Sequence, residues 1–76
     1  MAIERPLDLL NNSKGKRVLV ELKNGRTFVG KLVAFDIHIN CVFEDAEEME
    51  NGETKRKIGD MFLRGDTIIL ISPPPK

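Results

Sequence analysis

Residue types that cross-link, bind metals or stack are scarce in this chain. Its 76 residues include one cysteine, one histidine, four phenylalanines and no tyrosine or tryptophan. A single cysteine excludes an internal disulfide, and one Cys with one His does not make a zinc site, so we expect no metal and no cofactor. Cys41 shares its alternate positions with Ile39 and Phe43 and is expected to be a small buried group rather than a reactive thiol. Four phenylalanines are too few for the stacking surface of many RNA-binding sheets.

Net charge is also absent, because twelve basic residues balance twelve acidic ones. This argues against a protein that coats nucleic acid through bulk positive charge, so any nucleic-acid site has to be local. No apolar run reaches the roughly 18 residues that span a bilayer. Polar residues between Glu4 and Asp8 interrupt the start before the apolar stretch of a secretory signal could form. We expect a soluble protein of the reducing cytoplasm with no membrane partner.

The length predicts one domain, residues 1–76, with a thin core. Disulfides and metals are excluded as supports, which leaves oligomerisation. Residues 1–16 are expected to form a short helix and a turn, with Pro6 in the first turn and leucines on one face. The simplest role for this helix is a lid on one open end of a sheet. A contact between Arg5 and a ligand is the alternative.

Residues 17–71 alternate between apolar and polar side chains and predict five strands of a mainly β fold. We expect strands at 17–23, 26–35 and 39–49, then a returning strand that ends at Leu63, and a last strand at 67–71. Asn24-Gly25 and Asn51-Gly52 are hairpin signals, because both residue types accept positive φ. Gly30 inside the second strand predicts a sharp bend, hence a strongly bent antiparallel sheet that forms a small open barrel. Residues 72–76 form a proline-rich tail.

Five of the twelve acids lie between Glu44 and Glu50. A solvated strand end is the simplest interpretation of this run, and an acidic face for a basic partner is the alternative. Lys55-Arg56-Lys57 follows the second hairpin turn, so cross-strand charge pairs explain it better than a basic patch.

The last strand is apolar at every position from Ile68 to Ile71, although it stands at the end of the sheet. A bare apolar edge is an aggregation hazard, and strands that are apolar on both faces are usually buried. A neighbouring copy is therefore expected to cover it. If the fourth strand of one copy pairs with the fifth strand of the next, the head-to-tail contact closes into a ring or continues as a filament.

Two polar clusters interrupt the strands. Asp36, His38 and Asn40 alternate between the second and third strands, so their side chains point the same way. Arg64 and Asp66 flank a glycine before the last strand, and Asp66 is placed to orient Arg64 or Asn40. An imidazole and a guanidinium stack on flat rings, and an amide both donates and accepts hydrogen bonds. Together these groups predict a pocket for a single unpaired nucleobase.

The chain resembles the Sm and Sm-like (Lsm) proteins, most closely the archaeal single-domain members. The resemblance covers nearly the whole length and includes the N-terminal helix, Asn24-Gly25, Gly30, and Phe35 before Asp36-x-His38-x-Asn40. It also includes Arg64-Gly65-Asp66 before the apolar strand. The two signatures at this separation are specific together, whereas either alone is weak.

The resemblance implies that His38 and Arg64 sandwich a uracil and that Asn40 reads its polar edge. It also implies that Asp66 holds Asn40 in orientation and that Asp36 braces the loop.

By the same resemblance, Gly65 lets the backbone approach the base, and the copies form a ring with their pockets around a pore. The bacterial hexameric relative has Lys-His where this chain has Arg64-Gly65, which favours seven subunits over six. The implied function is binding of single-stranded U-rich RNA in RNA metabolism or ribonucleoprotein assembly, without enzymatic activity. The sequence does not identify the cellular RNAs or any protein partner.

Three alternatives stay open at this point. In the first alternative, the chain forms a structural or protein-interaction ring with a vestigial RNA site. In the second, Asp36 and His38 act as an acid–base pair of a small nuclease, although no nucleophile or second histidine accompanies them. The third concerns the site alone: His38 is a hydrogen-bonded turn residue and Arg64 a surface ion-pair partner.

Overall fold

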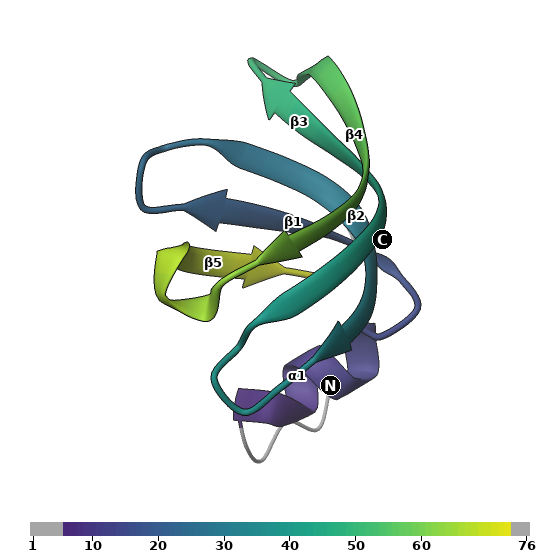
Figure 1. Cartoon of the computed structure of the whole chain (residues 1–76), viewed down its shortest axis with the longest axis vertical. Helices are drawn as coiled ribbons and strands as arrows, with labels where there is room; N and C mark the ends of the chain where they lie inside the picture. Colours follow the sequence, from purple (N-terminus) through teal and green to yellow (C-terminus); the bar gives the residue numbers. More distant parts are fainter. Residues whose placement is uncertain (1–5, 74–76) are drawn as a thin grey trace.

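The computed structural model describes residues 6–73 of the chain. A helix precedes the strands in Figure 1: α1 (Pro6–Ser13), β1 (Arg17–Leu22), β2 (Thr27–Phe35), β3 (Cys41–Glu50), β4 (Glu53–Leu63), the 3₁₀ turn η1 (Gly65–Thr67) and β5 (Ile68–Ser72). The predicted contact of Arg5 and the tail beyond Pro73 lie outside the described residues. Within residues 6–73, no helix has the length and apolar character that a membrane crossing requires.

The helix α1 covers one open end of the bent sheet, as predicted (Figure 1). Leu10 and Ser13 are buried, and Leu7, in the first turn of the helix, packs against the core. The Ser13 hydroxyl donates to the carbonyl of Leu9 (2.9 Å), so this polar side chain is buried with a partner. After the helix, the N–H of Gly15 donates to the carbonyl of Leu32 (2.7 Å) and ties the helix to β2.

The five strands form one antiparallel sheet in the order β4-β3-β2-β1-β5. Alternate residues of β1 and β2 point inward, because side chains along a strand alternate between its two faces. They make the core with the inward residues of β3; its strand members are Val18, Val20, Leu22, Phe28, Leu32, Cys41, Phe43 and Ala46. The predicted fold class is confirmed, and β4 and β5 lie at opposite edges of the sheet.

Close packing at Gly30 explains the bend in β2. A Cβ on this residue would lie 3.1 Å from the Cβ of Phe43 and 3.3 Å from the Cα of Ala46, tighter than ordinary contact. The register between β2 and β3 shifts between Val29 and Lys31, which brackets Gly30. The missing side chain therefore lets β2 press against β3 where the sheet curves (Figure 1).

The two hairpin turns differ from each other. Asn51 and Gly52 both have positive φ (55° and 79°), as the sequence predicts for a two-residue turn. At the first hairpin only Gly25 does (φ 85°), so the expectation for Asn24 is wrong. The N–H of Gly25 donates to the carbonyl of Leu22 (2.9 Å), and the Asn24 side chain accepts from the N–H of Arg26 (3.0 Å). Because β1 ends at Leu22 and β2 begins at Thr27, this loop has four residues where two were predicted, and its asparagine caps the turn through its side chain.

Two strand starts also differ from the prediction. The third strand begins at Cys41 rather than Ile39, because Ile39 has a φ of 64° and belongs to the preceding turn. The fifth begins at Ile68, because Thr67 completes η1. In the single chain β5 is uncovered, with Ile69 62% and Leu70 43% exposed, so its expected burial requires a neighbouring copy.

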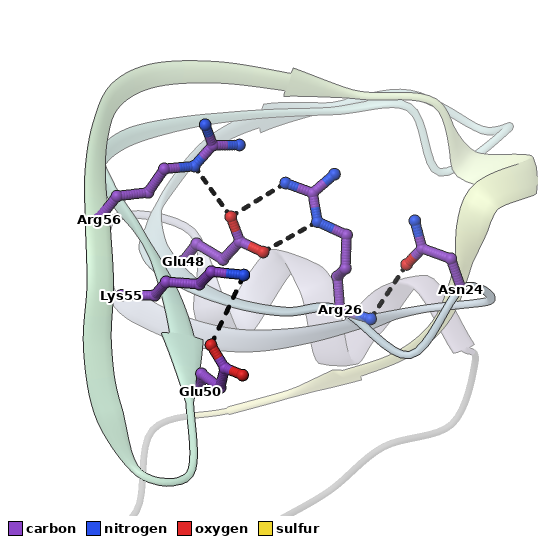
Figure 2. A network of polar contacts seen from close by, with 6 residues as sticks. All are labelled: Asn24, Arg26, Glu48, Glu50, Lys55 and Arg56. Atoms are coloured by element: carbon purple, nitrogen blue, oxygen red, sulfur yellow. Dashed lines mark hydrogen bonds and ion pairs between the residues drawn. The ribbon is translucent and has the colours of Figure 1, made fainter.

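A charged network lies beyond the other end of the core (Figure 2). Glu48 of β3 is only 4% exposed, so the expectation of a fully solvated acidic run is wrong at this residue. Its carboxylate accepts from Nε and Nη2 of Arg26 and from Nε of Arg56, each at 2.9 Å. Lys55 pairs with Glu50 at 3.5 Å. The predicted cross-strand pairing of the basic run with the acids is confirmed for Arg56 and Lys55.

Candidate nucleic-acid interface

The carboxylate of Asp36 organises the turn between β2 and β3. Its Oδ1 accepts from the backbone N–H groups of His38 (2.8 Å) and Asn40 (3.1 Å), and its Oδ2 accepts from the side-chain amide of Asn40 (3.0 Å). The hydrogen bond from the Asn40 amide, with those from the two backbone N–H groups, lowers the pKa of Asp36 despite partial desolvation. The structure thus confirms that Asp36 braces the loop, which we call the 36–40 turn.

Backbone geometry at Ile39 anchors this turn to the core. A β-branched residue with positive φ is unfavourable and persists only where its surroundings enforce it. Here the Ile39 side chain packs against the hydrophobic core, while Ile37 is 76% exposed and His38 is exposed. The packing of Ile39 therefore fixes the turn on the core, and the imidazole of His38 faces solvent.

Gly65 brings the second cluster, the 64–66 turn, against the first. Its N–H donates to Oδ1 of Asn40 (2.8 Å). A Cβ on Gly65 would collide with the carbonyl oxygen of His38 and lie 2.8 Å from the carbonyl carbon of Ile39. The backbone that Gly65 lets approach is therefore that of the 36–40 turn; its approach to a base stays a prediction. Two turns separated by more than twenty residues are interlocked by this contact.

Asp66 has a different role from the one that the resemblance implies. Its carboxylate pairs with the guanidinium of Arg64 (3.2 Å), and the Asn40 amide is held by Asp36 and Gly65 instead. The expectation that Asp66 orients Asn40 is wrong, whereas its alternative, that Asp66 orients Arg64, is right. Sequence reasoning missed Thr67, whose hydroxyl donates to the carbonyl of Arg64 (2.7 Å) and closes the turn. Threonine at the end of a short polar turn was the available signal.

Both planar side chains face solvent. Arg64 has 73% of its side chain exposed, and His38 makes no side-chain hydrogen bond to any described residue. The alternative of a hydrogen-bonded turn histidine is therefore wrong for the imidazole, while Arg64 does have the surface ion pair that this alternative expected. Asn40 is half-buried between the two turns. Its fixed amide keeps one N–H and one oxygen lone pair beyond the bonds described, so it can still donate once and accept once.

Cys41 lies just behind the site and is chemically quiet. It is fully buried, and burial raises the pKa of its thiol to about 11. The thiol donates to the carbonyl of Ile39 (3.1 Å). A buried protonated thiol is a poor nucleophile, so the predicted structural role of Cys41 is confirmed. Among residues 6–73, His, Cys, Asp and Glu side chains do not gather in threes that could hold a metal ion.

Comparison with known proteins agrees with the geometry. The family model for the LSM domain matches residues 8–73. An Archaeoglobus fulgidus protein described as snRNP Sm-like is 54% identical over 71 residues (93% of this chain, 92% of that protein), and one from Thermococcus sibiricus is 50% identical over 70 residues (92% of each).

Solved structures are similar over the same range. The Pyrococcus abyssi Sm protein in complex with a uridine heptamer has a TM-score of 0.88 and 46% identity, covering 93% of this chain and 100% of that one. A heptameric archaeal Sm protein has a TM-score of 0.84 and 43% identity, covering 90% and 98%. This chain belongs to the LSM-domain family of Sm-like proteins.

Proposed function

We propose that this protein forms a homo-oligomeric ring that binds single-stranded U-rich RNA and acts in RNA metabolism or ribonucleoprotein assembly. One observation supports this proposal above the others: the N–H of Gly65 on the side chain of Asn40 joins the two polar turns into one surface. An imidazole, a guanidinium and an oriented amide stand together there. These are the groups that hold unpaired bases by stacking and read their edges by hydrogen bonding.

The orientation of Asn40 supports uracil as the base. Uracil presents a donor next to an acceptor, and cytosine presents the reverse at the same positions. An amide that turned freely would accept either base. Asp36 and Gly65 fix which end of the Asn40 amide is oxygen and which is nitrogen, so the remaining donor and acceptor are offered in one order only. His38 and Arg64 then supply stacking, worth roughly 1–3 kcal/mol per base.

The edges of the sheet support head-to-tail assembly. β4 and β5 are the outer strands, and each exposes large apolar side chains, with Phe62 at 61% and Ile69 at 62%. Pairing of β4 in one copy with β5 in the next would satisfy both edges and cover these residues. We propose seven subunits, in line with the heptameric archaeal Sm protein. Repetition of one weak pocket around a pore multiplies affinity for a strand of consecutive uridines.

The proposal assigns binding and no reaction to this site. Both oxygens of Asp36 accept hydrogen bonds from the turn, which lower its pKa and make it a weak base. It is thus poorly suited to act with His38 as an acid–base pair.

Oligouridine affinity tests the proposal. His38→Ala, Asn40→Ala and Arg64→Ala should each weaken binding of fluorescent oligouridine by roughly 10- to 100-fold in anisotropy titrations, because each removes stacking or edge recognition. Lys14→Ala is the control, since Lys14 is exposed on the turn after α1, and should bind as the wild type does. An intact ring that binds no oligouridine would support the alternative of a structural or protein-interaction ring.

A further inference from the structure

The surface of the candidate site continues past Arg64 to the turn between β1 and β2. The N–H of Lys23 donates to the carbonyl of Thr67 (2.9 Å), which holds that turn against η1. A cleft of about 460 Å³ lies between them, lined by Lys23 and Asn24 on one side and by Arg64, Asp66 and Thr67 on the other. Its volume is within the range of small-molecule sites.

The charged network of Figure 2 adjoins the far side of this turn. Asn24, which lines the cleft, accepts from the backbone N–H of Arg26. The guanidinium carbon of Arg26 lies 5.2 Å from the centre of the Phe28 ring, and the guanidinium pairs with the Glu48 carboxylate. Contacts between neighbouring turns thus connect Asn40, Gly65, Lys23 and Arg26 in series, on the side of the molecule where these turns project (Figure 1).

The network carries more positive charge than its structure requires. The bonds from Arg26 and Arg56 lower the pKa of Glu48 to about 2, so its carboxylate stays ionised. One arginine would neutralise this buried carboxylate, and Arg26 already bonds to it with two donors. The second arginine leaves a net charge of about +1. Arg26 and Arg56 have 43% and 60% of their side chains exposed, so this charge faces solvent.

Most guanidinium donors of the pair are uncommitted. A guanidinium has five N–H donors. To described residues, Arg26 donates through Nε and Nη2 and Arg56 through Nε alone, all to Glu48. The η nitrogens of Arg56 and the other η nitrogen of Arg26 point away from the carboxylate, to the same side (Figure 2). Glu48 thereby fixes two planar forks side by side, the geometry that binds phosphate oxygens.

We propose that Arg26 and Arg56, oriented by Glu48, form a phosphate subsite for the RNA strand as it leaves the base pocket across the turn between β1 and β2. This inference rests on the proposed function and adds a second contact region to it. A strand that fills only the base pockets would not reach the subsite, and a longer strand would.

Two oligouridines distinguish the subsite from the pocket. A uridine heptamer, the ligand in the Pyrococcus abyssi complex, is compared with a longer oligouridine in anisotropy titrations at several salt concentrations. Arg56→Gln should weaken the longer strand about tenfold and leave the heptamer unchanged, because it removes charge-assisted hydrogen bonds to phosphate. The slope of log K against log salt should become shallower by about 0.7 for each phosphate that the variant no longer neutralises.

Lys55→Gln is the matched control. It removes the same charge one residue away, from a side chain that pairs with Glu50 and not with Glu48. Both oligouridines should bind this variant as they bind the wild type. Equal effects of Arg56→Gln and Lys55→Gln on the longer strand would overturn the subsite. If Arg56→Gln does not fold, Arg56→Lys replaces it and should show a smaller loss confined to the longer strand. Absence of heptamer binding by the wild type would instead contradict the proposed function.

Discussion

Single residues decide whether the candidate site exists, and Gly65 is the clearest case. A side chain there would collide with the carbonyl of His38, so Gly65→Ala should push the two turns apart. We expect oligouridine affinity to fall at least tenfold and the melting temperature to drop by about 5 °C or more, as separation breaks the bond to Asn40. Anisotropy titration and thermal denaturation measure the two effects.

Gly52→Ala provides the comparison for this variant. Gly52 also resists substitution, but only through its positive φ, and a Cβ there meets nothing within 4 Å. The Gly52→Ala variant should lose about 1 kcal/mol of folding free energy and bind RNA as the wild type does. Wild-type affinity in Gly65→Ala would show that the interlock of the turns is dispensable.

The residues of the 36–40 and 64–66 turns show how much of the site could be predicted from the sequence. The two signatures predicted two polar turns, and the structure brings these turns together, because Asp, His and Asn on alternate positions do not suit a strand interior. They could not show which carboxylate holds Asn40. Asp36 reaches the amide because the turn folds back on itself with Ile39 at positive φ, and Asp66 is turned toward Arg64 by η1. Both depend on backbone angles that residue spacing does not reveal.

At the scale of the strand, the burial of Glu48 shows how a bulge defeats sequence alternation. Cys41 and Phe43 face inward, so strict alternation would bury Asp45 and Glu47. Asp45 instead has a φ of 51°, and the register between β3 and β4 shifts beside it. The inward positions become Ala46 and Glu48. Strand existence and pairing were predictable from alternation and turn residues, whereas this change of phase was not.

The Glu48 network makes stability depend on pH in a defined window. The pKa of Glu48 is about 2 in the fold, against 4.5 ordinarily, so the network stabilises the fold fully above about pH 4.5 and loses this effect as pH falls toward 2. Glu48→Gln should lower the melting temperature by about 5–10 °C at neutral pH. The gap between variant and wild type should close between pH 4.5 and 2, as followed by circular dichroism.

Glu50→Gln is the control for this series, because Glu50 is 59% exposed and has a single lysine partner. It should change the melting temperature by a degree or two at any pH, as surface ion pairs contribute little. A gap between Glu48→Gln and the wild type that stays constant down to pH 2 would show that the ionised carboxylate does not provide the stability.

At the scale of the whole molecule, the single chain leaves two sheet edges and a row of apolar side chains without cover. Sequence alone indicated this, because a strand as apolar as β5 does not suit an edge facing water. Ile69→Glu places a charge where the next copy should pack, and burying it there costs more than assembly can supply. We expect the folded protein to elute as a monomer in size-exclusion chromatography with light scattering.

Leu19→Glu tests whether any added charge on an exposed apolar position would do the same. Leu19 lies on β1 inside the sheet, not at an edge, and is 37% exposed. Its substitution should leave the ring intact. The Ile69→Glu monomer, with one pocket in place of several joined pockets, should lose at least about 100-fold in oligouridine affinity. If it keeps full affinity as a monomer, the ring is not what makes a weak single-base pocket into an RNA-binding site.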